Sequence, residues 1–181
     1  MSTFGHAALG AAFARLASDS GDRYPRWWMV AAMMTLAFLP DLDFVVPLFA
    51  AVDPLGPWGH RGASHSLLVS ATAGAIAWFL VRRRYRAWVL AAICAGCVAS
   101  HGIVDMLTDA DLGVMLFWPL TDARLLAPWH PIPIAPVGPA ILTSWGALRL
   151  VTEIAWFAPV WLYAVWPRTH ERPAPADREP S

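Results

Sequence analysis

The chain has 181 residues, of which 57% are hydrophobic and only 14% are charged, whereas a typical soluble domain is about 25% charged. This composition favours a single membrane-embedded domain, and the continuous apolar runs exclude the alternating pattern of a β-barrel. The formal net charge is zero, and no basic patch with interleaved aromatic residues indicates a nucleic-acid partner.

The N-terminal quarter predicts two helices. Residues 3–18 form an alanine-rich apolar stretch, which favours a helix that packs closely on its neighbours. The start of the chain lacks the basic segment and cleavage site of a signal peptide, so we expect this helix to remain. Residues 27–39 predict a second helix that ends or kinks at Pro40.

Two carboxylates, Asp41 and Asp43, lie in the apolar segment that contains Pro40 and continues to Val52. A charged carboxylate near the middle of a membrane helix costs about 2.5–3.5 kcal/mol on insertion scales. Because two neighbouring carboxylates also repel each other, a bound cation would offset both costs. This pair is the first indication of a metal site.

The middle of the chain predicts a loop followed by a helical pair. Residues 53–62 are rich in glycine and proline and predict the loop. Ser64 is a good N-cap for a helix over residues 65–81. The arginine-rich segment 82–86 predicts a short turn before a helix over residues 87–107.

Residues 108–143 are rich in proline but too apolar for a free loop, so we expect them to lie at the membrane interface or to cover a cavity. Residues 145–166 predict the last span. We expect residues 1–166 to form one membrane-embedded domain and residues 167–181 a disordered cytoplasmic tail. The predicted fold class is an all-α polytopic membrane bundle of about four to five transmembrane helices.

The orientation follows from the arginines, since cytoplasmic loops carry an excess of basic residues. Ten of them fall on one predicted side, namely Arg15, Arg23, Arg26, Arg82, Arg83, Arg84, Arg86, Arg168, Arg172 and Arg178. The other side carries Arg61, Arg124 and Arg149. Helices that alternate in direction then place the N-terminus outside, in a multi-pass protein of a bacterial cytoplasmic (inner) membrane.

Under this topology, separate pieces of chain place their histidines and aspartates at the same outer, periplasmic depth. These residues are His6, Asp41, Asp43, His60, His65, His101 and Asp105. Random scatter would not usually produce such an alignment. We expect the seven side chains to converge on one metal site that faces the periplasm.

The spacing and residue types indicate which metal would bind. His101 and Asp105 are four residues apart, which places them on one helix face with Cβ atoms about 5–6 Å apart. The positive end of the helix dipole keeps a first-turn His65 neutral and able to bind metal. Imidazole and carboxylate without thiolate suit a divalent transition metal. We predict one or two zinc ions, with manganese or iron as alternatives.

Such a site predicts a metal-dependent hydrolase. Two ions that share a carboxylate can activate a water molecule and clamp a phosphoryl oxygen. Arg61 is the candidate to hold a phosphate by its planar guanidinium, and Asp41 or Asp43 could act as the general base. The expected partner and substrate is a membrane lipid, phospholipid-like in character. The sequence predicts no oligomeric state.

The combined pattern resembles the YdjM-type family, described as LexA-regulated, membrane-bound metal-dependent hydrolases. The residues that carry this resemblance are His6, Pro40-Asp41-Leu42-Asp43, the segment 60–66, Ser100-His101, Asp105 and Trp118-Pro119. Their order is also similar to that of the zinc-dependent phospholipase C and P1 nuclease group. This second resemblance implies five ligands, His6, Asp41, His65, His101 and Asp105. The chain departs from it at Glu153, which has no histidine four residues earlier.

Other functions remain open at this point. The same residues could bind an ion in transit through a transporter, or they could fix helix packing in a non-catalytic metal-binding protein. Arg61 could anchor at lipid head groups instead of holding substrate. Cys94 and Cys97 share a helix face and could form a redox pair, although two small buried hydrophobic residues are the favoured interpretation.

Overall fold

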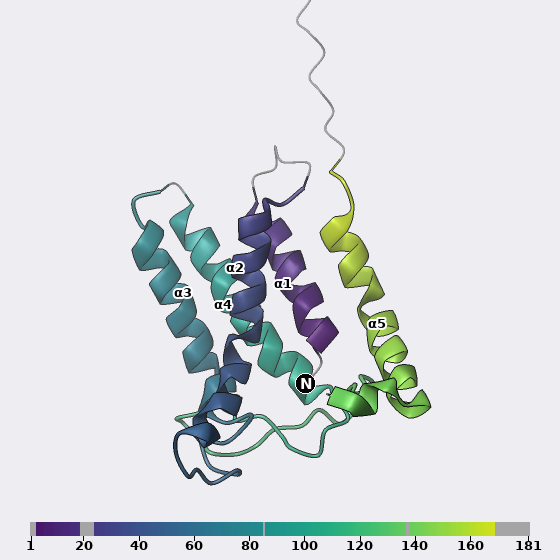
Figure 1. Cartoon of the computed structure of the whole chain (residues 1–181). Coiled ribbons are helices and arrows are strands. Elements are labelled where there is room, and N and C mark those ends of the chain that lie inside the picture. The colour runs from purple at the N-terminus through teal and green to yellow at the C-terminus, as the bar shows by residue number, and fades with distance from the viewer. Residues whose placement is uncertain (1–2, 19–23, 85, 137, 169–181) are drawn as a thin grey trace, which may run out of the picture.

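The computed structural model describes residues 3–18, 24–84, 86–136 and 138–168. These residues form five α-helices, three 3-10 helices and no β-strand. The helices run side by side between two ends of a bundle, and the longest connections gather at one end (Figure 1). This architecture confirms the predicted all-α membrane bundle.

Helices α1 (Thr3–Ala17) and α2 (Trp27–Phe38) pack backbone to backbone. A Cβ atom added to Gly10 would lie 2.7 Å from the Cα of Met34, so only glycine allows this approach. Around this contact α1, α2 and α4 share an apolar core. It consists of Ala14, Met33, Ala37, Cys94 and Cys97.

Both cysteines lie in this core as free thiols. Cys97 is fully buried, and its Sγ donates to the carbonyl of Met33 at 3.3 Å. These surroundings favour the interpretation of Cys94 and Cys97 as small hydrophobic residues.

The predicted break at Pro40 is present. Helix α2 ends at Phe38, and the chain continues as a 3-10 helix, η1, over Leu39–Leu48. A 3-10 helix has about three residues per turn, so residues two apart point in different directions. Asp41 and Asp43 are both buried but therefore reach different neighbours.

Helix α3 covers Leu67–Val81 and α4 covers Ala87–Met106. The predicted cap at Ser64 is wrong, because the N-cap is Ser66, whose side chain accepts a hydrogen bond from the N–H of Val69. The three residues before it form the 3-10 turn η2, Ala63–His65. His65 therefore lies ahead of the helix and not in its first turn.

The long connection between α4 and α5 (Ser144–Val165) covers one end of the bundle, with a short 3-10 helix, η3, at Gly138–Leu142. Its first part runs along the segment that leads into α3. The N–H of Met115 donates to the carbonyl of Arg61, and the N–H of Leu67 donates to that of Leu116, both at 2.9 Å. The connection therefore packs against the segment that holds Arg61, and its place at the membrane interface stays a prediction.

Within the described residues, three helical segments are long and apolar enough to cross a membrane, Trp27–Leu48, Ala87–Met106 and Ser144–Val165. Helices α1 and α3 have 15 residues each, which at about 1.5 Å per residue is shorter than a hydrocarbon core of about 30 Å. Residues 169–181, the greater part of the predicted disordered tail, lie outside the described residues.

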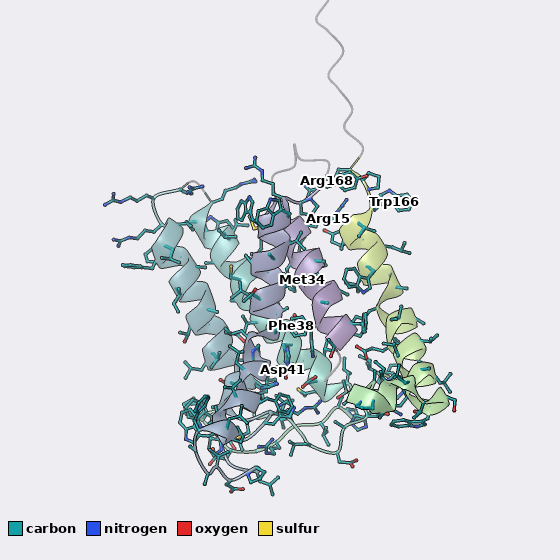
Figure 2. The ribbon with its side chains drawn as sticks, in the orientation of Figure 1. Arg15, Met34, Phe38, Asp41, Trp166 and Arg168 are labelled. Carbon is teal, nitrogen blue, oxygen red and sulfur yellow. The ribbon has the colours of Figure 1, made fainter. Side chains whose placement is uncertain are left out.

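The described arginines divide between the two ends as the sequence predicts. Arg15 and Arg168 lie at one end, where Arg15 donates to the carbonyl of Trp166 and Arg168 donates to the carbonyl of Arg15. Figure 2 shows this end opposite Asp41. Arg61 lies at the Asp41 end, since its backbone N–H donates to Asp43 at 3.1 Å.

Candidate functional site: a buried histidine and aspartate cluster

Four side chains from three elements meet at the covered end of the bundle. They are Asp41 of η1, His65 of η2, and His101 and Asp105 of α4. Each offers one ligand atom, all four atoms lie within 4.8 Å of one another, and all four residues are buried. We call them the metal quartet.

The separations inside the metal quartet are typical of ligands of one ion. His101 Nε2 lies 3.3 Å from Asp41 Oδ1 and 3.9 Å from Asp105 Oδ2. His65 Nε2 lies 3.8 Å and 3.6 Å from the same two oxygens. Donor atoms at about 2.0–2.2 Å from a single ion are about 3.0–4.3 Å apart. Hydrogen-bonded pairs would instead lie about 2.7–3.2 Å apart.

The cluster also holds buried polar atoms without a hydrogen-bond partner. Among the described residues they include both imidazole nitrogens of His6, both oxygens of Asp41, His65 Nε2, His101 Nε2 and both oxygens of Asp105. Asp105 Oδ2 makes no hydrogen bond but forms an ion pair with Arg61 Nε at 3.0 Å. Leaving one such group unpaired costs about 1–3 kcal/mol, and more when it is charged. Because all these atoms lie together, one cation would satisfy many of them, so the donor set fits a metal ion.

His6 joins the metal quartet from α1. Its Nε2 lies 3.3 Å from Asp105 Oδ1, the oxygen that does not face the other two histidines. Its ring stacks on that of His101, with centroids 3.7 Å apart. His6 is fully buried and could be a fifth ligand.

His101 is held in the tautomer that a metal requires. Its Nδ1 lies 2.7 Å from the carbonyl oxygen of Ala37. A carbonyl only accepts hydrogen bonds, so Nδ1 carries the proton and Nε2 presents its lone pair to the cluster. An imidazole that donates its other N–H in this way is typical of metal-bound histidines.

Ser64 and Asp43 together orient His65. The Ser64 hydroxyl lies 2.9 Å from His65 Nδ1 and donates to Asp43 Oδ2 at 2.8 Å, and this Oδ2 lies 3.3 Å from the same nitrogen. Asp43 Oδ2 also accepts the backbone N–H of Arg61 at 3.1 Å. Asp43 is therefore saturated with partners from the protein and supports His65 from behind, on the side away from the metal quartet.

The pKa of His65 reflects these neighbours. Burial lowers the pKa, but the hydrogen bonds and charges of Asp105 and Asp43 outweigh burial, so the pKa of His65 lies above its usual value. A metal at Nε2 would therefore compete with a proton.

His60 lies at the rim of the site. Its Nδ1 is 2.9 Å from Asp43 Oδ1, its ring packs on Phe44, and its side chain is 23% exposed. With Asp43 and His65 it forms a second possible metal triad. Two ions would have to share His65 through both ring nitrogens, so the geometry favours one ion in the metal quartet.

Arg61 is turned inward, with only 1% of its surface exposed. Its Nε lies 3.0 Å from Asp105 Oδ2, and its terminal nitrogens donate to Thr108 Oγ1 at 3.1 Å and to the carbonyl of Leu112 at 2.7 Å. Arg61 adopts a positive φ of 61°, which is uncommon for a residue other than glycine. Gly62 is needed for a close approach, since a Cβ there would lie 2.2 Å from the carbonyl oxygen of Pro57.

These contacts bear on two sequence-based roles of Arg61. A buried guanidinium does not anchor at lipid head groups. Its use as a phosphate holder stays a prediction, and it would require N–H groups that now bind Asp105, Thr108 and loop carbonyls to change partners.

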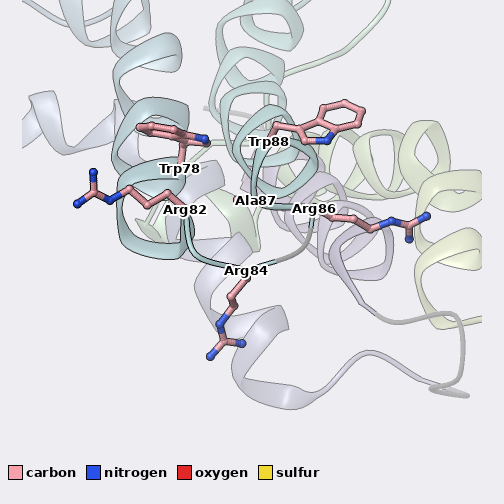
Figure 3. Close-up of a pocket in the computed structure, with 6 residues that line it drawn as sticks. All are labelled: Trp78, Arg82, Arg84, Arg86, Ala87 and Trp88. Atoms are coloured by element: carbon pink, nitrogen blue, oxygen red, sulfur yellow. The ribbon is translucent and has the colours of Figure 1, made fainter.

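A separate cavity of about 490 Å³ lies at the α3–α4 turn and is lined by Trp78, Arg82, Arg84, Arg86, Ala87 and Trp88. Figure 3 shows the three arginine side chains extending in different directions. Because the guanidinium groups do not converge, this cavity does not form a site for one anion. Its arginines agree with the predicted topology signal.

Fold and site together define a helical membrane protein with a buried imidazole and carboxylate cluster that could hold a metal ion. Residues 1–172 match the sequence pattern of the YdjM inner membrane protein family. The chain is 32% identical over 140 residues to "Inner membrane protein YbcI" of Escherichia coli (strain K12). The matched region covers 74% of this chain and 77% of that protein. The chain belongs to the YdjM inner membrane protein family.

The family match agrees with the predicted inner-membrane location. No solved structure matches the chain, so the similarity to the phospholipase C and P1 nuclease group stays a prediction. The side of the membrane on which the cluster opens is likewise a prediction, based on the arginines alone.

Proposed function

We propose that the protein is a membrane-embedded metal-dependent hydrolase that cleaves a phosphoester bond in a lipid or amphiphilic substrate. The observation that carries this proposal is the group of unpartnered buried nitrogen and oxygen atoms in and beside the metal quartet. A divalent transition metal bound there would polarise a phosphoryl oxygen and lower the pKa of a water molecule.

The residues of the chain would have distinct roles in this reaction. Asp41, His65, His101 and Asp105 bind the ion, and His6 completes the site from α1. Asp43 is better suited to orient His60 and His65 than to bind metal itself, since its oxygens already have four protein partners. Arg61 neutralises Asp105 and holds its carboxylate in place.

Substrate would approach from the rim where His60 is partly exposed. Apolar side chains surround this end of the bundle, including Leu42, Phe44, Leu55 and Trp58, all of them exposed. Aromatic and aliphatic residues at this depth suit contact with acyl chains at a membrane interface. This surface supports a lipid or amphiphile as the substrate class and, by the arginine rule, the periplasmic face as its source.

Transport of an ion is the main alternative, and the core argues against it. A transporter needs polar groups that continue beyond the cluster. Between the metal quartet and the Arg15 end, the described core is instead filled by Ala14, Met33, Ala37, Cys94 and Cys97. A non-catalytic metal-binding protein is the second alternative, and activity measurements separate it from a hydrolase.

The test is hydrolysis by the purified protein in nanodiscs, with zinc or manganese and a panel of phospholipids. We expect metal-dependent release of a phosphorylated product, reduced by at least 100-fold in His101→Ala and unchanged in the exposed-residue control His130→Ala. Metal binding without hydrolysis of any phosphoester would contradict the proposal that the protein is a hydrolase. Metal flux into proteoliposomes without hydrolysis would support the transporter.

A further inference from the structure

Helix α5 carries one buried acidic residue, Glu153, and its side chain reaches the start of α1. Glu153 is fully buried, near the middle of a helix whose surface is otherwise mainly exposed. Its Oε1 accepts the backbone N–H of Phe4 at 2.9 Å and that of Gly5 at 3.2 Å. The sequence offered no signal for this contact, because the partners are backbone groups about 150 residues away.

The contact provides hydrogen-bond partners for backbone N–H groups at the start of α1, and such partners matter most inside a membrane. The first four N–H groups of a helix have no partner within the helix. An unsatisfied backbone group in hydrocarbon costs several kcal/mol. A carboxylate also interacts favourably with the positive end of the helix dipole. Glu153 therefore caps α1 from another helix, and this explains why a carboxylate is retained inside an apolar span.

The cap lies directly beside a residue of the candidate metal centre. His6 follows Gly5 in the chain, with its Nε2 3.3 Å from Asp105 and its ring stacked on His101. Neither nitrogen of His6 has a hydrogen-bond partner that would hold the ring in place. The position of His6 therefore depends on where the first turn of α1 is fixed.

We propose that Glu153 is a positioning residue for the metal centre and acts through His6. It fixes the first turn of α1, and so holds the His6 imidazole against Asp105. Helix α5 contributes no side chain to the metal quartet, so it can influence the site through this cap or through the packing of Phe157 with Ala8 and Val104. The inference rests on the proposed metal site, and its test separates the two.

The test is a set of metal titrations on purified protein with Co²⁺ or Zn²⁺ and a competing chelator. Glu153→Leu removes the cap without leaving a buried charge, and we expect about 10-fold weaker binding, as for lost outer-shell partners. Glu153→Gln keeps an acceptor oxygen and should restore most of the affinity. Phe157→Ala, one turn along the same buried face of α5, controls for lost packing.

A double-mutant cycle identifies the route. If Glu153 acts through His6, Glu153→Leu should change the affinity by less than 2-fold in a His6→Ala background. An equal loss in both backgrounds, or no rescue by Gln, would overturn the proposal and indicate general destabilisation.

Hydrogen exchange provides a readout that does not depend on metal. In metal-free protein, amides of residues 4–8 should exchange faster in Glu153→Leu than in Glu153→Gln or Phe157→Ala. Unchanged exchange of these amides in Glu153→Leu would overturn the proposal that Glu153 caps α1. If the variants show this exchange pattern but the native protein binds no metal, Glu153 caps α1 as described. In that case the proposed function is wrong, and the positioning role of Glu153 is wrong with it.

Discussion

His101 Nδ1 lies 2.7 Å from the carbonyl oxygen of Ala37, and this contact joins α4 to the last turn of α2. This contact sets the direction of the His101 imidazole. Ala37 lies only four residues before Asp41, whose Oδ1 is 3.3 Å from His101 Nε2. The protein itself therefore holds two residues of the metal quartet in register. Preorganisation of this kind lowers the cost of binding an ion.

The two neighbouring aspartates should behave differently on substitution. Asp41→Ala removes a direct ligand and should abolish stoichiometric metal binding. Asp43→Ala removes one of the two residues that orient His65, so binding should weaken by about 10–100-fold but persist. Isothermal titration of both variants with Zn²⁺ checks this. Equal, complete loss in Asp43→Ala would instead indicate that Asp43 is a ligand.

Removal of metal should destabilise the native protein. A ligand that binds only the folded state at 1,000 times its Kd contributes about 4 kcal/mol, which corresponds to a Tm shift on the order of 10 °C. We expect EDTA to lower the Tm of the native protein by this amount in a detergent-based thermal scan. The Tm of Asp105→Asn should not respond to EDTA, and an equal response would contradict a specific site.

Arg61 should be a stability determinant as well as a neighbour of the site. Arg61→Ala leaves Asp105 without its cationic partner and removes the donors to Thr108 and Leu112, so the free energy of unfolding should fall by about 3–5 kcal/mol. Arg61→Lys should recover only part of this, because an ammonium cannot form the same fork of bonds. Unfolding in denaturant measures both, and a change below 1 kcal/mol would contradict the contacts.

Gly10 should tolerate no side chain. In Gly10→Ala the new Cβ would lie 2.7 Å from Met34 Cα, so α1 must move away from α2. We expect a loss of about 1–3 kcal/mol. Gly96→Ala is the matched control, since its Cβ would meet only the side chain of Phe13, at 3.3 Å. Comparable losses in the two variants would show that the α1–α2 contact is not limiting.

The sequence predicted the helices and the convergence of the candidate ligands because both depend on simple regularities. Apolar runs set the helices, and the arginine distribution placed His6, Asp41, His65 and His101 at one end of the bundle. These four side chains and Asp105 do meet. That these residues bind a metal ion remains a prediction.

The supporting contacts could not be predicted, because they depend on three-dimensional detail. Asp41 and Asp43 point in different directions along η1, but which neighbours each one meets depends on the packing of η1 against other segments. Asp41 meets His101, whereas Asp43 meets His60 and Ser64. The Ser64 hydroxyl donates to Asp43, a contact that the sequence does not reveal, and Ser66 caps α3 instead. Glu153 binds backbone N–H groups, which leave no trace in the sequence.

The central claim is that Asp41, His65, His101 and Asp105 bind one divalent transition metal. The most direct measurement is elemental analysis of the purified native protein beside Asp105→Asn, both confirmed as folded by circular dichroism. We predict about one zinc, manganese or iron ion per native chain and less than a tenth of that in the variant. Equal metal content in the two proteins, or none in the native protein, would contradict the claim.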